Sequence, residues 1–570
     1  MKKYLLVLVG LCCVLSYALA ERPDYPELKK SDANIIGHVL DKKTKEHLPY
    51  ITIALKGTTI GTVTDATGHY FLKNLPEGNF ILEVSSVGYK TVTRNVTLKK
   101  GKTLEEDFEI EEDAIALDGV VVSANRSETT RRMAPTLVNV VDLKLFETTN
   151  SSTLSQGLNF QPGVRVETNC QNCGFQQVRI NGLDGPYTQI LIDSRPVFSA
   201  LSGVYGLEQI PASMIERVEV MRGGGSALFG SSAIAGTINI ITKEPLRNSG
   251  QLSHTITSLG GSSSFDNNTS LNASLVTDDH RAGLYIFGQN RYRSGYDYDG
   301  DGFTELPKLK NQTVGFRSYL KTSTYSKLTF EYHHMQEFRR GGDMLNRPPH
   351  EAHIAEQLQH SIDGGSLKFD YFSPDEKNRL SVFASAANTD RDSYYGPGND
   401  PLKAYGKTTD LTAMGGAQYV HTFDKCFFMP SDLTAGLEYN RDRLKDNMWG
   451  YNRHTDQTVN IYSAFLQNEW KNDRWGILIG GRLDKHNMVD NVIFSPRANL
   501  RFNPTQNINL RLSYSSGFRA PQAFDEDMHI ENVGGTVAMI ERAKDLKEEK
   551  SQSFSVSADM YHRFGAFQTN

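Results

Sequence analysis

Hydrophobic and polar residues alternate with a period of two in many segments of the second half of the chain. Clear examples are residues 284–289, 433–439 and 508–514. This period places successive side chains on opposite faces of a β-strand. We count about 14 such segments after residue 250, most of them near the ~9–11 residues that a tilted membrane strand requires. The pattern predicts a large antiparallel sheet of membrane-spanning strands.

The connections between these segments alternate in length. Short polar turns are expected at residues 373–378, 471–474 and 503–507. Long loops are expected at residues 292–312, 336–364, 390–410 and 442–457. Short turns on one side and long loops on the other are typical of outer-membrane barrels. Residues 250–570 are therefore predicted to form an antiparallel transmembrane β-barrel.

Two smaller regions precede this sheet. Residues 34–112 contain short alternating runs separated by turn residues, which predicts a seven-stranded β-sandwich of ~80 residues. An acidic linker follows it at residues 105–113. Residues 125–245 include the segment 215–243, in which a strand, three glycines and a second apolar strand follow closely. This succession predicts a compact α+β wedge.

The N-terminus carries an export signal. Lys2 and Lys3 precede an apolar run, and Ala18-Leu19-Ala20 forms a small-x-small cleavage site, so residues 1–20 are predicted to be a signal peptide. No other stretch approaches the ~18–20 apolar residues of a membrane helix. We therefore expect a secreted or periplasmic protein, or a barrel.

Composition supports an exported β protein, with 48 Gly, 25 Tyr and 28 Phe. The net charge of −5 offers no electrostatic attraction for nucleic acid. Of the five cysteines, Cys12 and Cys13 lie in the signal peptide, which leaves Cys170, Cys173 and Cys426. In an oxidising compartment, Cys170 and Cys173 are predicted to form a local disulfide. A zinc site would need two more ligands, and none has suitable spacing. The sequence predicts no role for Cys426.

Catalytic motifs are absent from the sequence. It contains no G-x-S-x-G elbow and no H-E-x-x-H helix. Residues 225–232 fit a phosphate-binding glycine frame but lack its lysine, so nothing would hold the terminal phosphates. We expect a protein that is not an enzyme.

Several motifs resemble those of one family. Residues 215–243 are similar to the end of the plug domain of TonB-dependent outer-membrane receptors, and residues 178–182 and 189–197 resemble other plug strands. Residues 518–521, Phe-Arg-Ala-Pro, resemble the FRAP box of these receptors. Residues 34–112 are similar to the carboxypeptidase regulatory-like domain found ahead of some plugs.

The resemblance implies a plug domain at residues 125–245 and a barrel at residues 250–570. Barrels of the family close with 22 strands, whereas this chain has room for about 14. Because an open sheet edge has no backbone partners in lipid, we expect the barrel to be incomplete and the chain to be C-terminally truncated.

Residues 117–124 resemble a TonB box, the segment that adds a strand to the sheet of the energy-coupling protein. The residues concerned are Asp118, Gly119, Val120, Val121, Val122, Ser123 and Ala124. Main-chain pairing needs only an extended backbone, so the sequence is permissive. An ordinary first strand of the plug is the alternative.

The resemblance implies TonB-dependent active transport of a scarce chelate across the outer membrane. A ferric siderophore or haem is our first expectation for the cargo, and cobalamin or an oligosaccharide is the alternative. A surface-binding or adhesion protein that does not transport remains open. The implied partners are the TonB protein, the chelate and outer-membrane lipid, and we also consider a surface lipoprotein.

Two groups of residues are candidate binding sites, although no cofactor is required. Asp297, Asp299, Asp301 and Glu305 resemble the start of a calcium loop, in which hard oxygen atoms converge around a glycine turn. His350 and His353 share a helical spacing that would let both reach one ligand. His529 follows the FRAP-like motif, where haem receptors carry a functional histidine.

Overall fold

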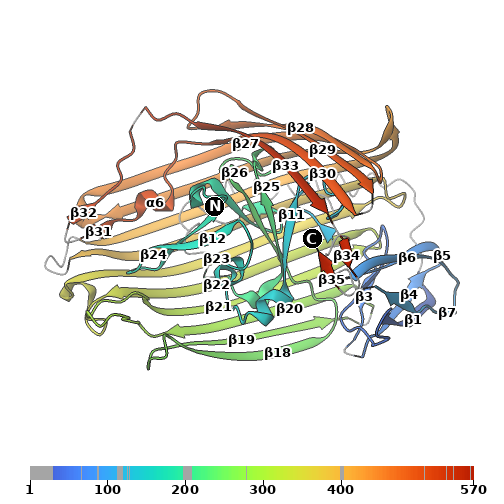
Figure 1. Ribbon diagram of the computed structural model, residues 1–570, viewed down its shortest axis with the longest axis horizontal. Helices are drawn as coiled ribbons and strands as arrows, with labels where there is room; N and C mark the ends of the chain where they lie inside the picture. The colour runs from blue at the N-terminus through green and yellow to red at the C-terminus, as the bar shows by residue number, and fades with distance from the viewer. Residues whose placement is uncertain are drawn as a thin grey trace.

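The computed structural model describes the chain from residue 30 onward and has three parts, a small β-sandwich, a plug and a curved sheet (Figure 1). The described residues are 30–65, 67–86, 89–111, 120–124, 126, 129–196, 208, 210–277, 279–397, 404–505, 507–533, 536–543, 545–560, 562–564 and 567–569. The expected signal peptide, residues 1–20, lies outside them.

The N-terminal sandwich consists of two four-stranded sheets around one apolar core. The first sheet contains β4 (His69–Pro76), β1 (Lys30–Asp41), β7 (Thr103–Glu105) and β8 (Phe108–Ile110). The second contains β3 (Gly61–Val63), β2 (Thr52–Leu55), β5 (Gly78–Ser86) and β6 (Tyr89–Leu98). Alternate residues point inward, as in β2, where Ile53 and Leu55 are buried. The predicted sandwich is confirmed, with eight strands where the turn spacing had predicted seven.

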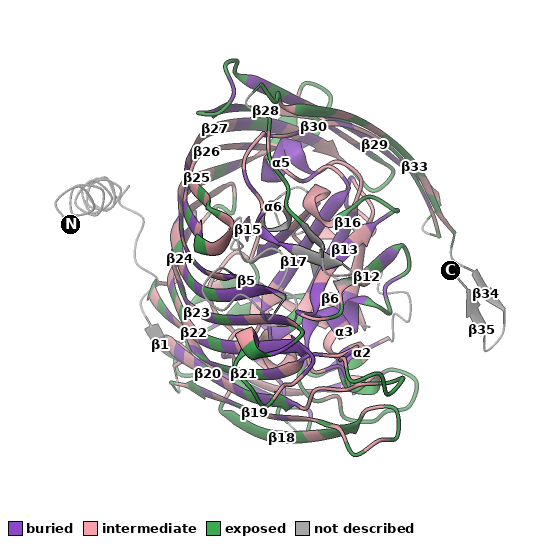
Figure 2. Ribbon diagram, turned by 90° about the vertical axis from the view of Figure 1, so that its left-hand side faces the viewer, coloured by how far each residue is buried: buried purple, intermediate pink, exposed green. Residues whose placement is uncertain are grey.

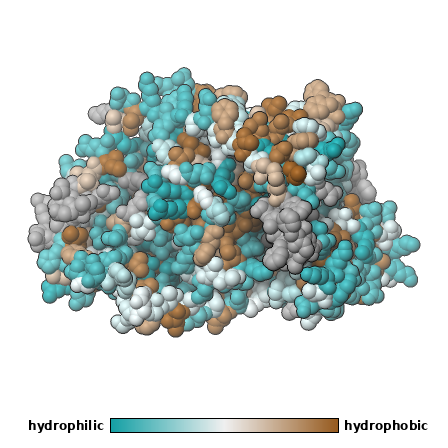
Figure 3. All heavy atoms as spheres, viewed as in Figure 1, coloured by the Kyte–Doolittle hydropathy of each residue, from teal (hydrophilic) through white to brown (hydrophobic). Residues whose placement is uncertain are grey.

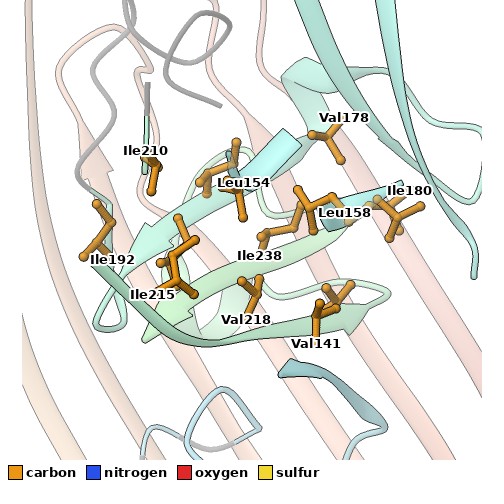
Figure 4. Close-up of a cluster of buried hydrophobic side chains, with 14 of the residues drawn as sticks. Val141, Leu154, Leu158, Val178, Ile180, Ile192, Ile210, Ile215, Val218 and Ile238 are labelled. Atoms are coloured by element: carbon orange, nitrogen blue, oxygen red, sulfur yellow. The ribbon is translucent and has the colours of Figure 1, made fainter. Parts of the chain in front are cut away.

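The plug is built on a five-stranded sheet. Its strand order is β11 (Val138–Asp142), β16 (Ile215–Arg222), β17 (Gly236–Thr242), β14 (Thr188–Ile192) and β15 (Arg195–Pro196). Helices α2 (Leu143–Thr148) and α3 (Leu154–Leu158) and the hairpin of β12 (Val164–Cys170) and β13 (Phe175–Ile180) complete it. Apolar residues from all these elements except β15 form one core, which includes Ile215, Val218 and Ile238 (Figure 4).

The glycine-rich connection between β16 and β17 is as compact as the sequence suggested. It adds one short helix, α5 (Ser226–Phe229), and Gly223 and Gly230 adopt positive φ angles of 88° and 85°. A Cβ atom on Gly236 would lie 2.4 Å from the carbonyl oxygen of Met221, so only glycine permits this strand pairing. The predicted strand–glycine–strand wedge is confirmed.

The largest sheet among the described residues has 14 strands, and each pairs antiparallel with the next. In order they are β18 (Ser249–Ser258), β19 (Phe265–Val276), β20 (Ala282–Arg293), β21 (Lys308–Ser323), β22 (Ser326–Gly342), β23 (Ile354–Phe372), β24 (Asn378–Pro397), β25 (Tyr405–Cys426), β26 (Met429–Met448), β27 (Arg453–Lys471), β28 (Trp475–His486), β29 (Ile493–Thr505), β30 (Ile508–Arg519) and β33 (Glu549–Met560). The sheet curves around the plug (Figure 2). This confirms the predicted antiparallel sheet and its strand number.

The loops on one side of the sheet are shorter than predicted. Only residues 343–353 separate β22 from β23, and residues 449–452 separate β26 from β27. The strands are correspondingly long, reaching 22 residues in β25, well beyond the ~9–11 residues that cross a membrane. Charged residues continue these strands, such as Arg339 and Arg340 in β22 and Arg441 and Lys445 in β26, which is why their sequences had indicated loops.

The two faces of the sheet reverse the usual pattern of a soluble protein. Apolar side chains on the outer face are exposed, for example Leu437 at 66% and Val556 at 83%. Polar side chains on the inner face are buried, including Arg291, Asp410 and Asp484. Hydrophobic residues gather over β30 and β33 at the upper right of Figure 3. Such an apolar outer band over a polar interior is typical of a membrane barrel.

In the described part of the chain, no helix is both long and apolar enough to cross a membrane.

The sandwich lies at the short-turn end of the curved sheet. The backbone amide of Thr59 donates to the carbonyl oxygen of Thr324, in the turn between β21 and β22, at 2.9 Å. We call the curved 14-stranded sheet the wall. The hairpin turn between β12 and β13 contacts the wall near the long-loop ends of its strands, for example at Glu356. The plug therefore has one end near the sandwich and an apex near the long loops.

Candidate functional site

The segment that resembles a TonB box enters the plug as an extended strand. Asp118 and Gly119 lie outside the described residues. Val120 and Val121 form β9 (Val120–Val121), which pairs antiparallel with β10 (Thr129–Thr130). The Val121 and Ala124 side chains are buried in a small apolar cluster of the plug. We call residues 121–124 the coupling segment.

A single carboxylate holds the coupling segment. Oε2 of Glu219 accepts hydrogen bonds from the backbone amides of Val122 and Ser123, both at 2.9 Å, and from the Ser123 hydroxyl at 2.7 Å. Its other oxygen, Oε1, accepts from Nε of Arg217 at 3.0 Å. Glu219 is fully buried in β16. The coupling segment is therefore attached directly to a central strand of the plug.

Sequence reasoning missed Glu219, although one signal was present. The residue stands between Val218 and Val220 in a strand that is buried on both faces. A buried carboxylate requires hydrogen bonds or a cation, so an acidic residue in such a strand indicates a partner elsewhere.

Arginines of the wall hold the plug. Arg497, Arg511 and Arg482 donate to the carbonyl oxygens of Ala124, Ala134 and Leu228 at 3.0, 3.1 and 3.1 Å. Because these bonds end on backbone atoms, they fix the position of the plug without depending on its side chains.

Ion pairs add charge to the same interface. Glu438 of the wall pairs with Arg126 of the plug and, at 2.7 Å, with Arg482. Glu208 of the plug lies 2.7 Å from Arg339, 3.3 Å from Arg293 and 3.4 Å from Arg291. The interface is therefore polar and charged, unlike the core of the plug.

A cavity with both polar and apolar lining lies between the plug and the wall. Its plug side is lined by Gln177, Gln189 and Ser231, and its wall side by residues such as Asn440 and Asp484. The polar groups on both sides of this cavity can exchange their contacts for water at modest cost.

In the structure Cys170 and Cys173 do not form the predicted disulfide, and both are free cysteines. Sγ of Cys170 donates to Oε2 of Glu356 at 3.1 Å, and Sγ of Cys173 lies 3.3 Å from Nε2 of His529. The same His529 nitrogen is 3.5 Å from Oε2 of Glu356. Each sulfur thus faces a polar group outside the hairpin, which the C-x-x-C spacing alone did not reveal. We call these four residues the apex cluster.

Contacts within the apex cluster shift the pKa values of Cys170 and His529. A hydrogen bond with Cys173, opposed by burial and aided by His529, lowers the pKa of Cys170 to about 7. Burial would lower the pKa of His529, but hydrogen bonds with Cys170 and Glu356 and their charges raise it to about 10. The geometry favours a cationic imidazole beside acidic partners.

The candidate calcium loop brings together three of its four predicted residues. The carboxylate oxygens of Asp297, Asp299 and Glu305 all lie within 4.8 Å of one another, and Asp301 is not among them. Asp297 accepts from the amides of Gly300 and Gly302 at 2.7 and 2.9 Å, which shapes the turn. Asp301 instead accepts from the amide of Phe303 at 2.8 Å.

The three candidate histidines do not converge. His350 lies in the 3-10 turn η3 (Pro349–Glu351), and its Nδ1 is 2.8 Å from the Tyr405 hydroxyl. His353 lies beyond the extended residue Ala352, and its Nδ1 is 2.6 Å from Oδ2 of Asp343. The shared helical face expected for His350 and His353 is therefore wrong, because the turn ends before His353. His529 belongs to the apex cluster.

Family models match all three parts of the chain. Residues 35–122 match the CarboxypepD_reg-like domain, and residues 130–237 match the TonB-dependent receptor plug domain. Residues 236–570 match the TonB dependent receptor-like beta-barrel.

Individual relatives and structures agree with these matches. The vitamin B12 transporter BtuB of Vibrio vulnificus is 24% identical over 425 residues, which cover 72% of this chain and 64% of that protein. The chain thus spans less than two thirds of the length of this curated relative.

Among solved structures, the siderophore receptor PirA from Acinetobacter baumannii superposes with a TM-score of 0.64 at 19% identity, covering 75% of this chain and 69% of that one. A mutant of the ferric enterobactin receptor PfeA from Pseudomonas aeruginosa gives 0.62 at 18% identity, covering 76% and 70%. These likenesses show the fold. Together with the match of the barrel model, they show that the chain belongs to the TonB-dependent receptors, a family of outer-membrane barrel proteins that are not enzymes.

Proposed function

We propose that this protein imports a scarce chelate across the outer membrane and that the TonB protein drives this import through residues 118–124. The observation that carries the proposal is the attachment of the coupling segment to β16 through Glu219. A strand added by TonB at residues 118–121 would lie immediately before this attachment point.

Force on the box would then act on the plug itself. A pull transmitted through Val122 and Ser123 reaches Glu219, and from there β16 and its neighbour β17. The plug core is apolar, whereas the plug meets the wall through many hydrogen bonds and ion pairs. Polar contacts can be exchanged for water, so the plug would shift against the wall before its core unfolds.

A ferric siderophore or haem is the cargo that we propose first, with cobalamin or an oligosaccharide as the alternative. The names of the similar proteins support both metal chelates, since the curated relative is named a vitamin B12 transporter and the similar structures are named siderophore receptors. Because His350 and His353 have separate partners, we propose a siderophore ahead of haem.

Uptake by whole cells tests the proposal. Cells that express the protein, or a variant lacking residues 118–124, receive labelled ferric siderophores, haem or cobalamin as separate probes. We expect the deletion to abolish energy-dependent accumulation of one probe while leaving its binding at the cell surface intact. Binding and retention of a probe that the deletion leaves unchanged, with no energy-dependent accumulation by either form of the protein, would instead support a surface-binding or adhesion protein.

We propose two further contacts for the protein. The exposed apolar side chains on the outer face of the sheet would contact outer-membrane lipid. Asp297, Asp299 and Glu305 would bind Ca²⁺ and stabilise the loop between β20 and β21, since carboxylate oxygens are the ligands that this ion prefers.

A further inference from the structure

We propose that the apex cluster, Cys170, Cys173, Glu356 and His529, binds one Zn²⁺ ion and thereby links the plug to the barrel wall. This site is separate from cargo transport and does not depend on the proposed function. It differs from the candidate calcium loop in place and in chemistry.

The geometry of the four ligand atoms fits a tetrahedral ion. In a zinc site with Zn–S of about 2.3 Å and Zn–N or Zn–O of about 2.0–2.2 Å, neighbouring ligand atoms lie about 3.4–3.8 Å apart. The separations across the cluster are 3.1, 3.3 and 3.5 Å, and all its ligand atoms lie within 4.8 Å of one another. Each separation therefore lies within about 1 Å of its value in a zinc site, so small side-chain shifts would close the site around the ion.

The ligand types select the metal. Two sulfur atoms, one imidazole nitrogen and one carboxylate oxygen suit Zn²⁺ and disfavour Ca²⁺ and Mg²⁺, which prefer oxygen alone. Four protein ligands also complete the coordination of a structural zinc site, leaving no position for a substrate. We therefore assign a resident ion, distinct from the cargo.

Burying the polar groups of this cluster costs free energy unless a cation compensates their charge. Cys173, Glu356 and His529 are 0%, 2% and 8% exposed. The two thiols and the Glu356 carboxylate converge in a dry environment, where negative charge on them requires a compensating cation. A divalent ion would supply that charge as both thiols and the His529 imidazolium release their protons.

An apolar shell encloses the cluster. The His529 ring lies between the rings of Phe175 and Tyr395, with centroid separations of 5.0 and 5.3 Å. Leu358 and Met448 extend the same buried group. Such a shell excludes water from the metal–thiolate bonds, a feature that tunes and stabilises metal sites.

The ion would join three parts of the molecule that are far apart in sequence. The cysteines lie at the turn of the β12–β13 hairpin of the plug, and Glu356 lies near the start of β23 in the wall. His529 follows α6 (Asp525–Met528), in the segment after β30. A metal bound here would fasten the apex of the plug, at the end opposite the sandwich.

Cobalt substitution of the full-length protein tests the site. The protein in detergent is reduced, stripped with a chelator, desalted and titrated with Co²⁺ and then with Zn²⁺. We expect one Co²⁺ per chain, with thiolate-to-cobalt charge-transfer bands and the strong visible bands of a tetrahedral site. Zn²⁺ should displace the cobalt and remove the bands.

Matched variants assign the ligands. Cys170→Ser and Cys173→Ser should each remove most of the charge-transfer intensity, and His529→Gln and Glu356→Gln should weaken binding by at least about tenfold. Cys426→Ser changes the third cysteine of the mature chain, which lies at the opposite end of the sheet near β26, and should leave the spectrum unchanged. Bands that persist in the Cys170→Ser/Cys173→Ser double variant would overturn the assignment.

A measurement on the unaltered protein covers the case in which variants fail to fold. X-ray absorption at the zinc edge should show two sulfur neighbours per zinc ion. Zinc surrounded only by oxygen and nitrogen, or a reduced protein that binds no metal at all, would refute the site. Neither result would bear on transport, so the two proposals fail separately.

Discussion

At the scale of single residues, the most informative side chain is Glu219. One buried carboxylate accepts three hydrogen bonds from the coupling segment and one from Arg217. Hydrogen bonds to a charged group contribute about 1.5–3 kcal/mol each, and a buried donor that loses its partner costs a similar amount. The stability of the coupling segment therefore depends on this residue.

Glu219→Gln should loosen the coupling segment. The substitution keeps the size of the side chain but turns one end into a donor that faces the amides of Val122 and Ser123. We expect these two amides to exchange hydrogen roughly 10- to 100-fold faster, corresponding to a loss of about 1.5–3 kcal/mol. Hydrogen–deuterium exchange of the full protein in detergent measures this effect.

Glu216→Gln is the matched control. Glu216 lies on the same strand and contacts Arg217 at 2.7 Å, but its side chain is 44% exposed and makes none of the three bonds to the coupling segment. Its exchange pattern at Val122 and Ser123 should match the unaltered protein. Equal acceleration in both variants would show that Glu219 is not the specific attachment.

At the scale of elements, the loop between β20 and β21 gives different positions to aspartates that look equivalent in the sequence. Asp297, Asp299 and Asp301 alternate regularly, yet only the first two converge with Glu305. The turn closes through the amides of Gly300 and Gly302, which bond to Asp297. Asp301 is turned toward its own backbone neighbour, Phe303.

Asp297→Asn should weaken calcium binding by roughly tenfold or more, because it removes a charged ligand from a small set. Asp301→Asn removes the same charge from the same loop and should change the affinity by less than about threefold. Isothermal titration of the chelator-treated protein with Ca²⁺ compares the two variants. Equal losses, or no heat of binding in the unaltered protein, would count against the proposed ion.

At the scale of the whole molecule, the plug and the wall meet through charges rather than through a shared apolar core. Glu438 pairs with both Arg126 of the plug and Arg482 of the wall, and the three side chains are almost fully buried. Removing one member of a buried ionic group is costly when a charge remains without a counterpart. Substitution of Glu438 and substitution of Arg126 should therefore destabilise the docking of the plug by different amounts.

Glu438→Gln should weaken the docking of the plug by about 3–5 kcal/mol, because it leaves Arg126 buried without its carboxylate. Arg126→Gln should cost less, since Glu438 keeps its pairing with Arg482. The urea concentration at which plug amides lose protection from exchange gives both values.

Asp424→Asn serves as the surface reference for this comparison. Asp424 pairs with Lys377 at 2.5 Å, but its side chain is 80% exposed, so the change should stay within about 0.5 kcal/mol. Losses of the same size in Glu438→Gln and Arg126→Gln would contradict the proposed arrangement of charges.

Local patterns were enough to predict the architecture. Alternation in segments such as 433–439 and 508–514 predicted the strands, because a period of two is a property of neighbouring residues. The glycines at 223–225 predicted the sharp connection of the plug for the same reason. Where charged residues continued a strand, as at the ends of β22 and β26, the pattern indicated loops and was wrong.

What the sequence alone determined is thus the succession of sandwich, plug and antiparallel sheet, because backbone geometry and side-chain polarity act over a few residues. What only the tertiary structure decided is which distant side chains meet. Cys173 and His529 are 356 residues apart, and Val122 and Glu219 are 97 apart, yet each pair is in contact. No local spacing encodes such contacts, since they arise when the plug is enclosed by the wall and buried polar groups must find partners there.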